Sequence, residues 1–409
     1  MIFSDILPKE TLHEHEKVCL FEMGYAYFCL IPTTCQSNFI FKPKLKLHLM
    51  KSNYLICLLA SGTLLFSISC KKSSTQPSNT PPPPSPGVNY LHAIKVTETG
   101  TSTIAILADH SVIWGNTGAW TTTNLSGIVD VTPNFTALKN DGTVWMMDTS
   151  GLTYNWSMIS GLSNITAISG MPGTSNKTNL VLKSDGTVWA WGQNRFGEIG
   201  DSSYITRHTP VQVKHLSGIT AIICGSAHCL ALKNDGTLWG WGQNLWGELG
   251  AGAVINTPYN YPIQVGGYSG IASIAAGNGT TLVLKNDGTV WASGVNSTGA
   301  LGNGTTTSGG VPTQVTGLTG VKAIVGGHAF SMAVKNDSTV WAWGSNASGS
   351  LGNGTTIAQS LTPVQVSYLA GVTSVSLSTF LYGGFAIEKD GVVWFWGNNS
   401  NNLPDRMVK

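Results

Sequence analysis

The residues that could carry out chemistry in this chain are few and lie far apart. Two acidic residues, Glu198 and Glu248, occupy the same place in two Gly-rich segments and could belong to a hydrolytic site. The histidines and arginines are scattered, and the chain contains no Gly-x-Ser-x-Gly elbow and no His-Glu-x-x-His motif. We therefore expect a protein that is not an enzyme and that carries no cofactor.

The thiols suggest no metal centre. Cys19, Cys29 and Cys35 are spaced in a way that matches no zinc pattern, so we expect no bound metal. Cys224 and Cys229 lie close together across a Gly turn. In an oxidising compartment they could form a disulfide, and they could equally remain two buried thiols.

Cys70 has a different context, because it follows a segment that is typical of a secretory signal. Met50–Cys70 begins with basic Lys51 and continues with the apolar stretch Leu55–Ser69, which is shorter than the span of about 20 residues that a membrane helix needs. The small residues before Cys70 resemble a bacterial lipobox, with Ser67 in place of the usual Leu. This resemblance implies cleavage before Cys70 and lipid on that residue, which would anchor the protein to a membrane. Secretion without lipid, after cleavage nearby, and a buried segment are the alternatives.

The regions around this signal differ in composition. Residues 1–49 show no recognisable pattern, and Met50 provides a better beginning, which suggests a start codon assigned too far upstream. Residues 71–87 are rich in Pro and Ser and should form an extended tether. Residues 88–409 form the folded domain. Its abundant Gly and its few charged residues, 10% of the whole chain, favour an all-β fold with many turns.

A hairpin repeats throughout this domain and must position any functional residue. In the clearest copy, apolar runs flank Lys233-Asn234-Asp235-Gly236, and we expect Asp235 and Gly236 to supply two positive φ angles to a tight turn. Seven copies place an aspartate at the turn: Asp109, Asp141, Asp185, Asp235, Asp287, Asp337 and Asp390. A period of about 50 residues is typical of a solenoid or a β-propeller.

Each clear unit adds two further elements to the hairpin. A Gly-rich turn follows the tryptophans, as in Trp241–Gly252, and a Pro-x-x-Val strand follows the turn, as in Pro262–Val265. This unit resembles the regulator of chromosome condensation repeat, which implies a seven-bladed β-propeller. The last unit is followed by a spare strand, Pro404–Val408. We expect that strand to join the first blade, which begins at Ala93–Leu107, and to close the ring.

Aromatic residues fall into a repeated set and a variable set. The repeated Trp-x-Trp pairs, such as Trp239 and Trp241, should pack between blades. The variable aromatic and arginine residues could bind a partner, because Tyr, Trp and Arg are enriched at binding hot spots. Our partner-binding candidates are Arg195, Phe196, Tyr204, Arg207, Trp246, Tyr259 and Tyr261, and Trp120, Tyr154 and Trp156 are further variable aromatics.

These observations lead to one functional hypothesis and its alternatives. Basic residues do not outnumber acidic ones from Val88 onward, so we expect no nucleic-acid partner. We expect a lipoprotein of the cell envelope, at the outer membrane or cell surface, that binds a protein or a glycan on one propeller face. An envelope polysaccharide hydrolase or lyase is the alternative. The resemblance also suggests a guanine-nucleotide exchange factor, which we discount because an exported protein would not meet a cytosolic GTPase.

Overall fold

The computed structural model describes residues 21–23, 26–32, 54–59, 83–98, 102–116, 119–148, 155–170, 178–252, 257–378, 383–397 and 402–409. The chain divides into two compact units, Met1–Gln76 and Pro77–Lys409. Within the described residues, no helix has the length and apolar character that crossing a membrane requires.

The first unit contains one small antiparallel sheet. Its strands are β1 (Phe21–Met23), β2 (Ala26–Pro32) and β3 (Tyr54–Leu59), in that order. β3 covers the beginning of the predicted signal segment. Cys70, the predicted lipidation site, lies outside the described residues, so the signal and the lipid anchor stay predictions.

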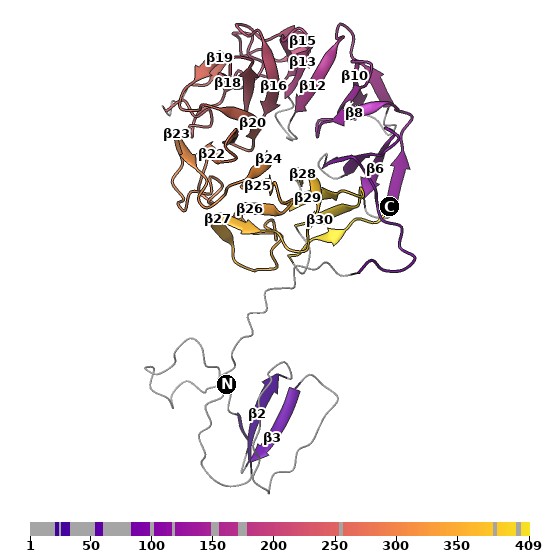
Figure 1. Cartoon of the computed structure of the whole chain (residues 1–409), viewed down its shortest axis with the longest axis vertical. Helices are drawn as coiled ribbons and strands as arrows, with labels where there is room; N and C mark the ends of the chain where they lie inside the picture. Colours follow the sequence, from indigo (N-terminus) through magenta and orange to yellow (C-terminus); the bar gives the residue numbers. More distant parts are fainter. Residues whose placement is uncertain are drawn as a thin grey trace. The chain divides into compact units, whose positions relative to one another are not determined.

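The second unit is a ring of seven four-stranded antiparallel sheets, as the sequence predicts (Figure 1). Blades 1 to 3 contain β4 (Lys95–Glu98), β5 (Thr103–Ile106), β6 (Val112–Asn116) and β7 (Ala119–Thr122); β8 (Ile128–Val131), β9 (Thr136–Lys139), β10 (Val144–Asp148) and β11 (Asn155–Met158); and β12 (Ile165–Gly170), β13 (Thr178–Lys183), β14 (Val188–Gly192) and β15 (Arg207–Gln212). Blades 4 and 5 contain β16 (Ile219–Cys224), β17 (His228–Lys233), β18 (Leu238–Gly242) and β19 (Tyr259–Val265); and β20 (Ile271–Ala276), β21 (Thr280–Lys285), β22 (Val290–Gly294) and β23 (Gly309–Gln314). Blades 6 and 7 contain β24 (Val321–Gly326), β25 (Phe330–Lys335), β26 (Val340–Ser345) and β27 (Gln359–Gln365); and β28 (Val372–Ser378), β29 (Gly383–Glu388), β30 (Val393–Trp396) and β31 (Asp405–Arg406).

The predicted hairpins are present, although their turns differ from our expectation. In blade 4 the Lys233 amide donates to the Thr237 carbonyl and the Gly236 amide donates to the Lys233 carbonyl, both at 2.9 Å. The Asp235 carboxylate accepts hydrogen bonds from the Thr237 amide at 3.0 Å and from its hydroxyl at 2.6 Å. Only Gly236 has a positive φ, of 82°, so the prediction of two positive φ angles is wrong. The loop is longer than a two-residue turn, and Gly236 occupies the bulge position that follows a type I turn.

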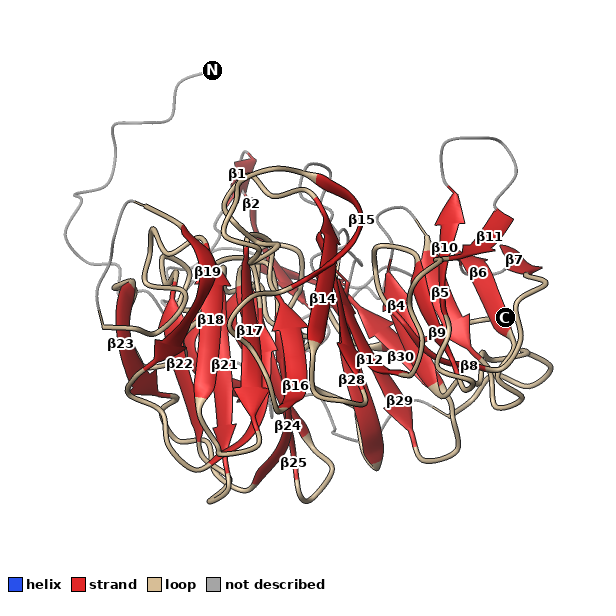
Figure 2. Cartoon of the chain, turned by 90° about the horizontal axis from the view of Figure 1, so that it is seen from above, coloured by secondary structure: helices blue, strands red, loops and turns tan. Residues whose placement is uncertain are grey.

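The strands alternate in direction within each blade, so the connections fall on two opposite faces of the ring. We call the face with the hairpin turns between second and third strands the turn face. The other face, which we call the loop face, carries the connections between first and second strands and between third and fourth strands. The Gly-rich segments lie on the loop face. Figure 2 shows that the described residues of the chain consist of strands and loops.

The repeated tryptophans pack between blades, as expected. Trp241 of blade 4 is fully buried against Leu180 and Ile199 of blade 3. Its indole nitrogen donates to the Glu198 carbonyl of blade 3 at 2.7 Å. The same bond occurs at the junctions of blades 5 and 6 and of blades 6 and 7. There the indole nitrogens of Trp343 and Trp396 donate to the carbonyls of Ala300 and Ser350, both at 2.9 Å. Each of these junctions is therefore held by a buried ring and one directed hydrogen bond.

The two ends of the chain pair at the junction of blade 7 and blade 1. The Leu91 amide donates to the Met407 carbonyl at 2.8 Å, and the Val393 amide donates to the Leu91 carbonyl at 3.1 Å. Met407 is buried in the same cluster as Val96 of blade 1. However, β31 pairs with β30 and belongs to blade 7, so our expectation that the last strand joins blade 1 is wrong. A strand that follows β30 after a short connection pairs most directly with β30, and blade 1 has four strands of its own.

Candidate functional site

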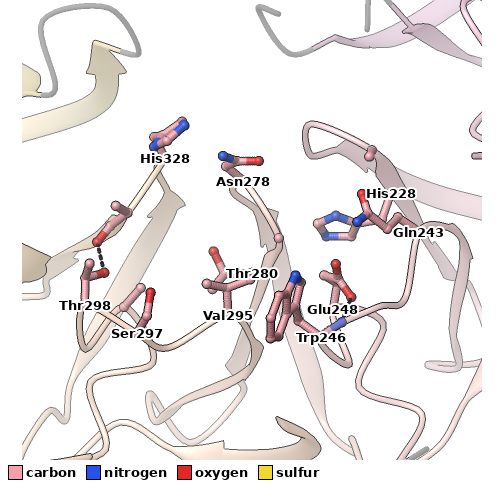
Figure 3. A pocket seen from close by; sticks show the side chains of 14 residues that line it. His228, Gln243, Trp246, Glu248, Asn278, Thr280, Val295, Ser297, Thr298 and His328 are labelled. Carbon is pink, nitrogen blue, oxygen red and sulfur yellow. Dashed lines mark hydrogen bonds between the residues drawn. The ribbon is translucent and has the colours of Figure 1, made fainter. Parts of the chain in front are cut away.

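A pocket of about 260 Å³ lies on the loop face where blades 4, 5 and 6 meet (Figure 3). It is lined by Ala227, His228, Gln243, Trp246, Glu248, Asn278, Gly279, Thr280, Val295, Ser297, Thr298, Ala300, His328 and Ala329. A second depression of about 400 Å³ lies beside β23, but its described lining contains no aromatic or ionisable side chain. The first pocket therefore offers the richer chemistry.

The inner wall of the pocket is built from the connections between first and second strands. The Ser226 amide of blade 4 donates to the Gly277 carbonyl of blade 5 at 3.3 Å, and the Asn278 amide donates to the Gly327 carbonyl of blade 6 at 2.9 Å. A Cβ atom added at Gly277 would lie 2.3 Å from the Gly327 carbonyl oxygen. Only glycine permits this close approach of two backbones, so three blades share one fixed inner rim.

The outer wall is built from the Gly-rich connections between third and fourth strands. In blade 4 the side-chain oxygen of buried Asn244 accepts a hydrogen bond from the Leu249 amide at 3.1 Å. Asn296 of blade 5 makes the same bond to the Leu301 amide at 2.9 Å. Buried amide groups of this kind are costly to leave unpaired, so each asparagine fixes the path of its loop.

Trp246 and Glu248 form one side of the pocket, and Figure 3 shows their side chains next to each other. Glu248 is only 1% exposed, and its Oε2 accepts a hydrogen bond from the Trp246 amide at 2.8 Å. Burial raises the pKa of this carboxyl group, and hydrogen bonds from its own loop lower it by less. Trp246 is 53% exposed, which is unusual for so large an apolar side chain in this ring. The carboxylate therefore holds the loop in a shape that presents the indole to solvent.

Two histidines complete the polar lining. His228 is buried with its Nε2 3.2 Å from the Thr281 hydroxyl, and desolvation lowers its pKa to about 4. Burial also lowers the pKa of His328. Both imidazoles are therefore neutral at pH 7, and no Lys or Arg occurs among the described lining residues. Glu248 is the ionisable acid of this lining, so the pocket favours a cation or a neutral polar group over an anion.

The structure brings one partner-binding candidate, Trp246, into this pocket. Arg195 and Phe196 occupy the equivalent loop of blade 3, where the Arg195 guanidinium carbon lies 5.4 Å from the centre of the Phe196 ring. Arg207 donates from Nε to Asp201 Oδ2 at 2.6 Å, so its guanidinium is held by its own loop.

The tyrosine candidates lie outside the pocket. Tyr204 is exposed, and its hydroxyl donates to the Pro258 carbonyl of the blade 4 loop at 2.9 Å. Tyr259 is half-buried and packs against the clusters on both sides of blade 4. Tyr261 is exposed on the outer strand β19, with its ring 6.2 Å from that of His215. Their predicted role in partner binding stays a prediction.

The other variable aromatics have diverse positions. The indole nitrogen of Trp120 donates to the Val408 carbonyl at 3.0 Å, so this residue belongs to the ring closure. Trp156 is buried in the core between blades 1 and 2. Tyr154 lies outside the described residues. Cys224 and Cys229 face each other on β16 and β17 and form a disulfide, which decides the choice that the sequence left open.

Gln243, Asn278 and His328 are among the polar residues of the pocket that sequence reasoning missed. Each occupies a connection that differs between units, and none of them is a Tyr, Trp or Arg, the residue types that are enriched at binding hot spots. An alignment of the units by their hairpins would have shown that Asn278 and His328 are equivalent positions in blades 5 and 6. That equivalence, together with Trp246, is the signal that could have found the site.

Comparison with known proteins agrees with this architecture. Human E3 ubiquitin-protein ligase HERC2 is 27% identical over 140 residues, which cover 33% of this chain and 3% of that protein. Human probable E3 ubiquitin-protein ligase HERC6 is 34% identical over 134 residues, which cover 31% of this chain and 13% of that protein. The chain thus spans only a small part of these curated relatives.

Solved structures give the same fold. Yeast RCC1 (Prp20), solved in complex with Kap60, superposes with a TM-score of 0.57 at 20% identity, covering 67% of this chain and 74% of that one. The RCC1-like domain family matches residues 161–403, which is more than half of the chain. With seven blades of this repeat in one closed ring, the chain belongs to the RCC1-like domain family.

Proposed function

We propose that this protein is an exported, lipid-anchored propeller that binds a partner protein on its loop face. The observation that carries the proposal is Trp246, an exposed indole on a loop that Glu248 and Asn244 hold in place. A rigid aromatic side chain at a pocket edge provides contact area with little loss of conformational entropy on binding. The propeller then acts as a platform, and the chemistry is recognition rather than catalysis.

Two further observations support a binding role. The inner rim and the Gly-rich loops are fixed by hydrogen bonds before any partner arrives, so little ordering is required on association. Yeast RCC1, which shares the fold, was solved bound to the protein Kap60. The lipid anchor at Cys70 and the envelope location rest on the sequence pattern of Met50–Cys70 alone.

A capture experiment tests this function. The propeller, residues 77–409, would be immobilised and exposed to membrane and culture-medium fractions of the source cells, in parallel with Trp246→Ala. We expect Trp246→Ala to reduce capture of a specific protein at least tenfold, because a hot-spot residue contributes about 2 kcal/mol or more. Met158→Ala, which removes a similarly exposed apolar side chain that is neither a binding candidate nor part of the pocket, is the matched control. A partner that is equally retained by Trp246→Ala would contradict the proposed site.

A glycan is the second candidate partner, because the amide groups of Gln243 and Asn278 line the same pocket as the exposed indole. A glycan array probed with the same two variants separates this candidate from a protein partner. The hydrolase or lyase alternative has weaker support, since glycoside hydrolysis usually needs a pair of carboxyl groups. Among the described lining residues Glu248 is the one carboxylic acid, and Glu198 is buried in the loop of the neighbouring blade.

The anchor has its own test. Intact-mass analysis of the native protein would report the first residue and any acyl chains at once. We expect a chain that begins at Cys70 and carries lipid. A chain that begins elsewhere and carries no lipid would support plain secretion and would leave the binding face unaffected.

A further inference from the structure

The loops of blades 3 and 4 contain the same aromatic and acidic pair, but only one of them supplies its own cation. In blade 3 the pair is Phe196 and Glu198, and the Glu198 Oε2 accepts a hydrogen bond from the Phe196 amide at 2.7 Å. In blade 4 the pair is Trp246 and Glu248, with the same bond at 2.8 Å. The loops are therefore equivalent down to this contact.

The residue before the aromatic side chain differs between the two loops. In blade 3 it is Arg195, whose guanidinium lies over the Phe196 ring. Burial raises the pKa of Glu198, and its loop's hydrogen bonds and, to a smaller extent, the Arg195 charge offset part of that rise. In blade 4 it is Leu245, which carries no charge. The blade 4 loop thus has the aromatic face and the buried carboxylate that accompany an arginine in blade 3, and it has a pocket of about 260 Å³ beside them.

We propose that this pocket receives the guanidinium or ammonium group of an arginine or lysine side chain from a partner protein. The proposal rests on the proposed function and names the group on the partner that the loop face recognises. A cation against the face of an indole is favourable, and the attraction grows when both are removed from water. A buried carboxylate also needs a compensating charge, which the described lining does not provide.

The remaining lining suits such a group in size and in hydrogen bonding. The volume is below the roughly 300–1,000 Å³ of pockets for drug-sized ligands, so one long side chain fills it better than a cofactor. Gln243 and Asn278 offer side-chain oxygens that can accept hydrogen bonds from a guanidinium. Figure 3 shows Asn278 and Thr280 between the Trp246 side and the His328 side of the pocket.

The test uses the fluorine NMR signal of Trp246 in protein labelled with 5-fluorotryptophan. Trp246→Phe identifies that signal among the 14 tryptophans of the chain. N-acetyl-arginine amide, its neutral isostere N-acetyl-citrulline amide and a methyl glucoside serve as probes. We expect the arginine probe to shift the signal with a Kd at least about tenfold lower than the citrulline probe, because hydrogen bonds to charged groups are the stronger ones.

Two loop variants and one control separate charge recognition from a structural effect. Glu248→Gln should remove the tenfold preference for arginine, and Leu245→Arg should weaken the probe because it supplies a cation within the chain, as Arg195 does in blade 3. Glu198→Gln is the matched control in blade 3 and should leave probe binding at Trp246 unchanged. Lowering the pH should also weaken binding, since Glu248 takes up a proton and the neighbouring His228 and His328 gain positive charge.

Each outcome decides the inference. Equal binding of arginine and citrulline, stronger binding of the glucoside, or a preference that survives Glu248→Gln would overturn it. If partner capture depends on Trp246 while the arginine probe does not bind, the proposed function stands and the cation pocket is wrong. If the probe binds with the expected preference and no partner is captured, the pocket assignment stands and the proposed function fails.

Discussion

The junction between blades 5 and 6 allows a quantitative test of how the ring is held together. Trp343 is fully buried there, and its indole nitrogen donates to the Ala300 carbonyl at 2.9 Å. The junction between blades 4 and 5 is packed differently. Ser293 stands at the position of the tryptophan, and the Tyr268 hydroxyl lies 3.1 Å from the Ser293 hydroxyl. At the position equivalent to Tyr268, the junction of blades 5 and 6 has Leu318, which packs in the same cluster as Trp343.

Replacing Trp343 and Leu318 by the serine and tyrosine of the preceding junction should show that the effects of the two changes on stability are strongly coupled. Trp343→Ser should lower the free energy of unfolding by about 3–5 kcal/mol for the lost ring. The lost indole hydrogen bond should add only about 0.5–1.5 kcal/mol, because the Ala300 carbonyl still accepts a hydrogen bond from the Ser331 hydroxyl at 2.9 Å. Leu318→Tyr alone should cost about 1–3 kcal/mol, because the larger ring meets Trp343. The double variant recreates the Ser293 and Tyr268 pair, so it should be about 1–3 kcal/mol more stable than the sum of the single changes.

Equilibrium unfolding in guanidinium chloride measures the three variants against the wild type, with the slope of each transition checked for a change in the unfolding reaction. The combined changes Leu216→Tyr and Trp343→Ser are a matched control, since these residues lie at different blade junctions. If the losses of unfolding free energy in Leu318→Tyr and Trp343→Ser simply add in the double variant, a serine–tyrosine pair cannot replace the buried tryptophan ring at this junction, and the reasoning is refuted.

Three further predictions follow from particular contacts. The free energy of unfolding should fall as the pH drops from about 6.5 towards 4, because the unfolded chain binds a proton at His228 that the folded chain excludes. The loss should approach about 3 kcal/mol. His228→Gln should flatten this part of a curve of unfolding free energy against pH. Gly277→Ala should lower the unfolding midpoint far more than Gly236→Ala, since a Cβ at Gly277 meets the Gly327 backbone at 2.3 Å whereas nothing lies within 4 Å of one at Gly236, where only the positive φ costs about 1 kcal/mol; equal midpoints would show that the inner rim does not hold the blades. Cys224 and Cys229 should resist alkylation until the protein is reduced, and reduction should cost only about 2 kcal/mol because the disulfide closes a short loop; thiol labelling followed by mass spectrometry checks the first point and thermal unfolding the second.

The blade architecture could be predicted from the sequence because the hairpin is a local structure. The Asp235 carboxylate, the Thr237 hydroxyl and the Gly236 backbone all act within one turn. The bond from a backbone amide to the turn aspartate recurs in all seven units. Trp241 could be assigned to packing between blades for the same reason, since a side chain that recurs at one position serves the repeated scaffold. The type of the turn could not be predicted from the sequence, because the pair Asp-Gly allows several combinations of φ angles and fixes none of them.

The site was predictable only in part. Trp246 was identified because it departs from the repeat, and the same rule selected Arg207 and Tyr259, which the structure places in an ion pair and in a half-buried contact. Arg207 is held in place because Asp201 forms an ion pair with it. Tyr259 is half-buried because it packs against the core that blade 4 shares with its neighbour. These contacts lie outside the pattern of a single unit, so the composition of a loop does not reveal them.

By itself, the sequence determined the unit, the number of units and their all-β character, because these follow from hydrogen bonds and apolar alternation between residues close together in the chain. Only the tertiary structure decided that β31 completes blade 7 and that Trp246, Asn278 and His328 of three different blades line one pocket. The physical reason is that the ring of blades brings together residues that are about 30 to 80 positions apart or at opposite ends of the chain. Their contacts are set by the packing of whole sheets, which no local pattern encodes.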